Sequence, residues 1–147
     1  WQLTAGVLVI VEPGTPAGWR RILSARARLL AAGAFMVAPC PHAHACPLAE
    51  PDWCHFAERV ERTRLHRTLK QADVPWEDEK FIYVAAARQT VLLFGSRVIA
   101  PPRTATGRVM LKLCQPDGVA NERLVTRREG AAFKAARRCN WGDVFSS

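Results

Sequence analysis

Three cysteines and three histidines lie close together between residues 38 and 56, in the sequence APCPHAHACPLAEPDWCHF. Four prolines interrupt the same stretch. Because proline lacks a backbone N–H and fixes its own φ angle, we expect a loop here. Thiolates and imidazoles are the side chains that bind zinc and iron–sulfur clusters. The chain has five cysteines and no recognisable secretory signal, which favours metal binding over disulfides.

The spacing of the cysteines points to an unusual metal site. Five residues separate Cys40 from Cys46, and seven separate Cys46 from Cys54. Zinc fingers and ferredoxin-like runs both place their ligands closer together. A fourth ligand must then come from elsewhere, and Cys114 is the best candidate because it ends a predicted strand just before a turn. Cys139, in a predicted helix, is expected to be an ordinary small buried residue.

The histidines leave the type of metal open. His42, His44 or His55 could replace one cysteine around a zinc ion. Equally, a histidine beside a thiolate ligand could support that ligand from behind. The residues alone therefore allow either an iron–sulfur cluster or zinc. A metal-free loop with ordinary buried cysteines is the less favoured alternative.

The elements that must position this loop begin with a strand and a helix. The apolar run Val7–Val11 predicts a strand buried on both faces, as in a parallel sheet. Thr15 suits a helix N-cap and Pro16 the first helical position, with the helix running to about Ala32. Gly33 then predicts the C-terminal stop. Residues 34–39 form a second strand, so strand, helix and strand predict a parallel unit with a right-handed crossover.

The apolar face of this first helix also carries an arginine. Arg26 shares that face, and we expect it to extend its charged end to solvent at the edge of the buried stripe. The apolar residues at helical spacing are Trp19, Ile22, Leu23, Leu29 and Leu30.

The rest of the chain predicts a mixed sheet in a single domain spanning residues 1–147. A second helix is predicted from Asp52 or Trp53 to about Lys70, followed by a polar connector at residues 74–80. Strands are expected at 81–88, within 90–107, at 108–114 and within 121–130. A helix at 131–141 closes the chain. The predicted fold class is α/β, with extra β-structure on the C-terminal side.

The charge favours a polyanionic partner. The formal net charge is +8 and the pI about 10.0, and most of the cations are arginines, which bind phosphate in a bidentate way. In the predicted second helix, Arg59, Arg62 and Lys70 share one face with His66. That stripe could follow phosphates or be a solvated face with ion pairs. Further along the chain, Arg127 and Arg128 strengthen the case for RNA.

Six blocks of the sequence resemble a known family. They are EPGTPAGW, APCPHAHACPL, DWCHF, PWEDEKF, LCQPDG and AARRCNWGD. In this order they are similar to the methyltransferase-like family of small-ribosomal-subunit assembly proteins, a mitochondrial small-subunit factor and its bacterial relatives. The resemblance implies a 4Fe–4S cluster on Cys40, Cys46, Cys54 and Cys114, with Cys139 outside the pattern.

The resemblance also implies a fold and a larger protein. The family fold is similar to a class I, S-adenosylmethionine-dependent (Rossmann-like) methyltransferase, and this chain would be its later half, with a Cys-rich insertion at about 38–56. A Gly-rich cofactor loop is not found in the sequence. Glu12 would lie at a carboxyl strand end and approach S-adenosylmethionine in the full-length protein, or it could simply shape the entry to the helix. The first residue is Trp1, which favours a piece of a longer chain.

Two functions of different classes follow. The first is an assembly factor that binds ribosomal RNA and the small ribosomal subunit, stabilised by the cluster. The second is an S-adenosylmethionine-dependent rRNA methyltransferase, whose cofactor site the missing half would supply, so that this piece alone would be inactive. A zinc-stapled structural domain is a third alternative. The expected location is the cytoplasm in a bacterium or the mitochondrial matrix in a eukaryote, and no apolar run is long enough to predict a membrane span.

Overall fold

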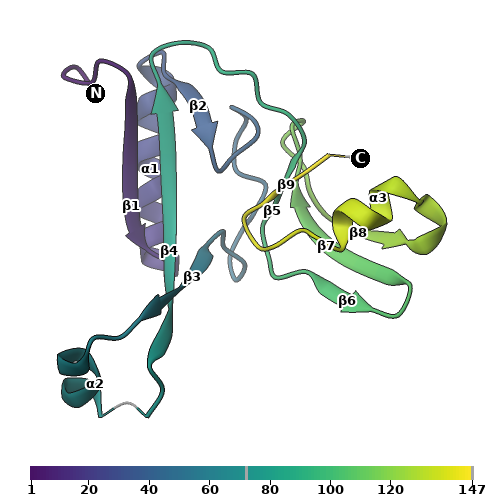
Figure 1. Cartoon of the computed structure of the whole chain (residues 1–147). Helices are drawn as coiled ribbons and strands as arrows, with labels where there is room; N and C mark the ends of the chain where they lie inside the picture. The colour runs from purple at the N-terminus through teal and green to yellow at the C-terminus, as the bar shows by residue number, and fades with distance from the viewer. Residues whose placement is uncertain (72, 147) are drawn as a thin grey trace.

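The computed structural model describes residues 1–71 and 73–146, which form two antiparallel sheets (Figure 1). The first sheet has the order β1-β4-β2, with β3 also paired to β4. Its strands are β1 (Val7–Pro13), β2 (Phe35–Ala38), β3 (Phe56–Glu61) and β4 (Trp76–Ala87). The helix α1 (Pro16–Ala31) packs on one face of this sheet. Helices and strands are both present, so the structure is compatible with the α/β class predicted from the sequence, but both sheets are antiparallel and the predicted mixed sheet is wrong.

The predicted parallel pairing is wrong, because every pairing in the first sheet is antiparallel. β1 and β2 do run in the same direction, but β4 lies between them and pairs with both. The sequence predicts a polar connector where the first half of β4 lies. It pairs only with β3, and its side chains from Asp78 to Lys80 are exposed, so its sequence is polar although its backbone is a strand.

Helix α1 begins and ends where its sequence predicts. The Thr15 hydroxyl accepts a hydrogen bond from the Gly18 N–H at 3.1 Å, which confirms the N-cap, and Pro16 occupies the first turn. Gly33 adopts a φ of +75°, a conformation that glycine reaches without strain. The buried core between helix and sheet includes Trp19, Ile22, Leu29, Met36, Ile82, Val84 and Ala86.

The second predicted helix is mostly wrong. Residues 56–61 form β3, and only α2 (Arg64–Lys70) is helical, capped by the hydroxyl of Thr63. Arg59 therefore lies on a strand and shares no helical face with Lys70, whose side chain lies outside the described part of the structure. β3, α2 and the start of β4 form an arm that projects from the first sheet (Figure 1).

The second sheet supplies the predicted C-terminal β-structure. Its strands are β5 (Ser96–Val98), β6 (Arg103–Ala105), β7 (Arg108–Cys114), β8 (Ala120–Thr126) and β9 (Val144–Phe145). The short 3₁₀ helix η1 (Arg127–Glu129) and α3 (Ala131–Ala136) follow β8, so the closing helix is shorter than predicted. Phe133 and Ala136 of α3 pack on the core of Val98, Val109, Leu111, Leu113, Val125 and Phe145.

Within the described residues, none of the helices combines the length and the apolar character that a membrane crossing requires.

Candidate metal centre

The segment between β2 and β3, residues 39–55, contains neither helix nor strand and is called the Cys loop below. Its prolines explain this local structure, as the sequence predicts. It carries Cys40, Cys46 and Cys54, all half-buried and free. The loop lies between the two sheets, so its side chains can reach residues of both (Figure 1).

All four cysteines of the predicted set line one cavity. Cys114 comes from the end of β7 in the second sheet, where its side chain is buried, and the other three come from the Cys loop. The remaining lining is largely apolar and is supplied by α1, β4, the loop itself and the region of β5. It includes Trp19, Ile22, Leu23, Leu48, Ile82, Val84 and Ile99. Cys139 lies elsewhere, beside the core of the second sheet.

The cysteines of this set are close enough for neighbouring thiols to affect the ionisation of Cys40, Cys54 and Cys114. Burial raises the pKa of Cys54 well above its usual value, and the thiols of Cys40, Cys46 and Cys114 raise it further. Burial, with added repulsion from Cys40 and Cys46, raises the pKa of Cys114 to about 12. The thiols of Cys54 and Cys114 are therefore protonated at neutral pH while no metal is bound. A metal that binds them must displace their protons.

His42 supports the Cys114 side of the cavity. Its side chain is only 5% exposed, and its Nε2 lies 3.3 Å from the Sγ of Cys114. Its ring stacks on that of His44, with centroids 5.7 Å apart. Burial and the nearby Arg26 lower the pKa of His42, which favours a neutral ring. This placement suits a residue that contacts the Cys114 thiol and fixes its orientation without binding the metal itself.

The thiols do not form a closed cage for a single ion. Within residues 1–71 and 73–146, no three His, Cys, Asp or Glu side chains are placed so that they could hold one metal ion. Around a 4Fe–4S cluster, each thiolate binds a different iron, so the sulfurs lie farther apart than around one zinc ion. The four thiols share the lining of one cavity.

Two arginines at this cavity were not recognised from the sequence as part of the site. Arg26 is only 5% exposed, so the expectation that it reaches solvent is wrong. Its Nη2 donates hydrogen bonds to the carbonyl oxygens of His42 and His44, at 2.9 and 2.8 Å. Arg97 of β5 donates to the carbonyl of Pro39 at 2.9 Å and to that of Gly142 at 2.7 Å. The signal that could have revealed Arg26 was its position on the apolar face of α1.

Glu12 lies at the end of β1, as predicted, and has a partner in the protein. Its carboxylate accepts a hydrogen bond from Nε of Arg21 at 2.9 Å and lies 2.7 Å from Nη2 of the same residue. Because Arg21 belongs to α1, the pair ties the strand end to the helix that follows. This geometry agrees with the alternative in which Glu12 shapes the entry to the helix.

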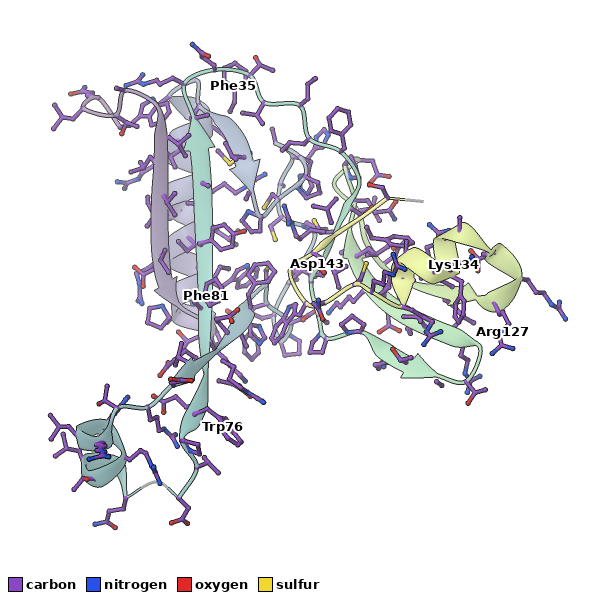
Figure 2. The ribbon with its side chains drawn as sticks, in the orientation of Figure 1. Phe35, Trp76, Phe81, Arg127, Lys134 and Asp143 are labelled. Atoms are coloured by element: carbon purple, nitrogen blue, oxygen red, sulfur yellow. The ribbon has the colours of Figure 1, made fainter. Side chains whose placement is uncertain are left out.

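The predicted RNA-binding residues fall into two separate groups. Arg59 makes a bidentate pair with Asp78, at 2.8 and 3.1 Å, and Arg62 is largely buried against Glu77, at 2.8 Å. By contrast, Arg127 and Arg128 are exposed on η1 and make no ion pair with any described residue. Figure 2 shows Arg127 and Lys134 at the outer end of the second sheet, far from the arm that carries Trp76.

Comparison with known proteins gives a consistent result. Residues 1–146 match the model of the family described as "Mitochondrial small ribosomal subunit Rsm22". The chain is 30% identical over 163 residues to the human ribosome assembly protein METTL17, mitochondrial, covering 98% of this chain and 33% of that protein. It is 25% identical over 191 residues to the Rsm22-cox11 tandem protein 2, mitochondrial, of Schizosaccharomyces pombe, covering 99% of this chain and 25% of that protein. The chain thus spans between a quarter and a third of the length of these relatives.

Proposed function

Because the chain belongs to the Rsm22 family, we propose that it is part of an assembly factor of the small ribosomal subunit that binds ribosomal RNA. The match of the family model to residues 1–146, nearly the whole chain, is the observation that carries this proposal. The name of the human relative, a ribosome assembly protein, supports it. In a eukaryote the protein would work in the mitochondrial matrix, as the names of its relatives suggest, and in a bacterium in the cytoplasm.

Within this function, Cys40, Cys46, Cys54 and Cys114 hold a 4Fe–4S cluster. Three observations support the assignment: the shared cavity, the free thiols, and the apolar lining that would shield a cluster from water. Zinc is the alternative, since thiolates suit both metals.

The cluster would act as a structural joint between the two sheets. Its ligands come from the Cys loop on one side and from β7 on the other. The other contacts between the sheets gather around the same loop. Among the described residues they include the Arg97–Pro39 hydrogen bond, the Lys112–Asp52 ion pair, and the contacts of His55 and Phe56 with Trp141. Because four thiolates bind the metal only when both sheets are in place, metal binding contributes directly to folding free energy.

The surface most suited to RNA is the outer end of the second sheet. Arg127 and Arg128 are exposed cations without acidic partners among the described residues, so a phosphate can bind them without first breaking an ion pair. Arg59 and Arg62 already bind Asp78 and Glu77. They would have to give up these partners, and we expect them to contribute less.

The second candidate function is rRNA methylation by the longer protein. The strand–helix–strand order of β1, α1 and β2 fits the later half of a class I methyltransferase sheet, which supports this alternative. The S-adenosylmethionine site would belong to the part of the protein that precedes this chain. Glu12 would contribute to that site only if it exchanged Arg21 for the cofactor.

Binding of ribosomal RNA by the full-length, metal-loaded protein tests the proposal. We expect binding to rRNA of the small subunit that weakens steeply as salt rises, with a log–log slope of about −0.7 to −0.9 for each phosphate bound. A parallel incubation with labelled S-adenosylmethionine measures methyl transfer to the same RNA. Affinity that does not change with salt contradicts the RNA-binding proposal, and methylated RNA favours the enzyme instead.

A further inference from the structure

We propose that Arg26 and Arg97 are the counter-charges of the metal centre, and that they hold its anionic thiolates and raise its reduction potential. The inference rests on the proposed function, because it requires a metal on the four cysteines. It goes beyond that function by giving two residues outside the ligand set an electrostatic role.

Arg26 is a buried cation without a buried anion. Its side chain is only 5% exposed, and its Nε has no hydrogen-bond partner in the described structure. Its neighbours are the neutral carbonyls of His42 and His44 and the thiol of Cys40. No acidic side chain of the described residues makes an ion pair with it. A charge buried in this way is costly unless an opposite charge accompanies it.

Arg97 is a second arginine at the same cavity, and its side chain is half-buried. It comes from β5 of the second sheet, whereas Arg26 comes from α1. Its hydrogen bonds also go only to carbonyls, those of Pro39 and Gly142, and it too makes no ion pair with a described residue. Both arginines line the cavity of the four thiols.

The charges balance when the thiols bind a metal centre. A 4Fe–4S core of charge 2+ with four thiolates has a net charge of about −2, as does one zinc ion with four thiolates. Two guanidinium groups bring the total close to zero. One-electron reduction of the cluster adds a further negative charge. Nearby cations stabilise this reduced state, so they raise the potential.

The test compares three variants in the full-length protein, purified anaerobically. R26M removes the charge and keeps much of the apolar stem, R26K keeps the charge and loses the paired hydrogen bonds, and R97M repeats the charge loss from the other sheet. R88M is the matched control, because the hydrogen bonds of Arg88 also go only to backbone carbonyls, those of Trp1, Gln2 and Thr4. Arg88 lies on the surface, where its guanidinium also stacks over the Trp1 ring. Redox titration gives the midpoint potential, and transfer of iron to a chelator gives the rate of metal loss.

We expect R26M and R97M to have a more negative midpoint potential and faster iron loss than the wild type. R26K should lie closer to the wild type, and R88M should match it. Complete loss of the cluster in R26M, with retention in R26K and R88M, supports the inference equally, because it shows that the charge holds the anionic centre. Equal potentials in R26M and wild type, or equal shifts in R26M and R26K, overturn it, since Arg26 would then act only through its hydrogen bonds to the loop.

The same experiment separates this inference from the proposed metal centre. A wild-type protein that holds neither iron nor zinc contradicts the centre itself. If the wild type holds zinc, the rate of zinc transfer to a chelator replaces the potential, with R26M expected to be faster and R26K close to the wild type. A loaded wild type with unchanged variants contradicts only the role of the arginines.

Discussion

Different interactions stabilise the first sheet and the Cys loop. α1 and the first sheet bury a continuous apolar core around Trp19, Ile22 and Val84, and the helix carries its own N-cap. The Cys loop has no regular structure and brings four thiols and two arginines to one cavity. Burial of apolar surface stabilises the first region without any ligand. The second region concentrates thiols and two arginines that make no ion pair with a described residue, and a bound metal centre would supply the missing negative charge.

This difference implies that metal binding mainly stabilises the contact between the two sheets. The folding of each sheet depends on it less. Cys114 belongs to a strand whose neighbours Leu111 and Leu113 are part of the core of the second sheet. Each sheet thus has an apolar core of its own. We therefore expect loss of metal to destabilise the contact between the two sheets before it unfolds either sheet.

The largest expected effect comes from C114S. This change should abolish metal binding, because serine offers no thiolate, and should expose residues 39–55 to proteolysis and fast amide exchange. The amides of α1 should stay protected. Hydrogen exchange resolved by segment, in parallel with metal analysis, measures both effects. C40S, C46S and C54S should behave alike.

The matched control for C114S is C139S. Cys139 lies beside the core of the second sheet and outside the cavity of the four thiols, so its replacement should leave the metal and the Cys loop unchanged. Metal retained in C114S, or lost in C139S, contradicts the assignment of the four ligands.

The second effect is a loss of RNA affinity when the exposed arginines Arg127 and Arg128 are replaced. The double reversal R127E/R128E should weaken binding to ribosomal RNA and reduce the salt slope by about one for each phosphate that the variant no longer binds. R59E/R62E should weaken it less, because these arginines are already paired with Asp78 and Glu77. Binding isotherms at several salt concentrations measure both variants. Equal affinity of R127E/R128E and wild type would show that the outer end of the second sheet is only a solvated surface.

The third effect is a pH dependence that reverses when metal is bound. In the metal-free chain, burial raises the pKa of Cys114 from its usual 9.0 to about 12, so the folded state holds this proton more tightly than the unfolded state. The resulting stability is fully present below pH 9 and is lost as the pH rises toward about 12. Cys54 shifts in the same direction. In the loaded protein, protons compete with the metal, so metal should instead be released as the pH falls.

Urea unfolding of the chelator-treated chain at a series of alkaline pH values measures the first half of this prediction. Metal content after incubation at acidic pH measures the second. A metal-free chain that becomes more stable as the pH rises above 9 would contradict the buried, protonated state of these thiols.

The smallest effect is a loss of stability at the N-terminus of α1, away from the Cys loop. T15A should lower the free energy of unfolding by roughly 1 kcal/mol, because the Gly18 N–H loses its partner at the helix N-terminus. T15S keeps the hydroxyl and should remain near the wild type. Metal content should not change in either variant. Thermal unfolding measures the loss, and an unchanged midpoint in T15A would show that the cap does not stabilise α1.

Local signals were sufficient to predict parts of both regions. Thr15, Pro16 and Gly33 set the bounds of α1 through their own backbone preferences, which do not depend on distant residues. The prolines of the Cys loop likewise predict its irregular structure. The type and spacing of the cysteines indicated a metal site that draws on a distant strand, and the structure places Cys114 in the cavity of the other three.

The errors arose where distant parts of the chain meet. Arg59 and Arg62 have a spacing that fits a helix, but their actual partners are Asp78 and Glu77 on the neighbouring strand β4. No local pattern identifies that strand as the centre of the sheet. Helical spacing put Arg26 on the apolar face of α1, yet only the folded structure shows that it lies at the cavity of the thiols.

Metal analysis of the wild type and C114S, both purified without oxygen, tests the central claim most directly. The measurement is iron, acid-labile sulfide and zinc per chain, with a visible absorption spectrum before and after reduction. We predict about four irons and four sulfides per chain in the wild type, with broad visible absorption that fades on reduction, and neither in C114S. A wild type without iron or sulfide, or a C114S protein that keeps the full cluster, would contradict a cluster held between the two sheets by Cys40, Cys46, Cys54 and Cys114.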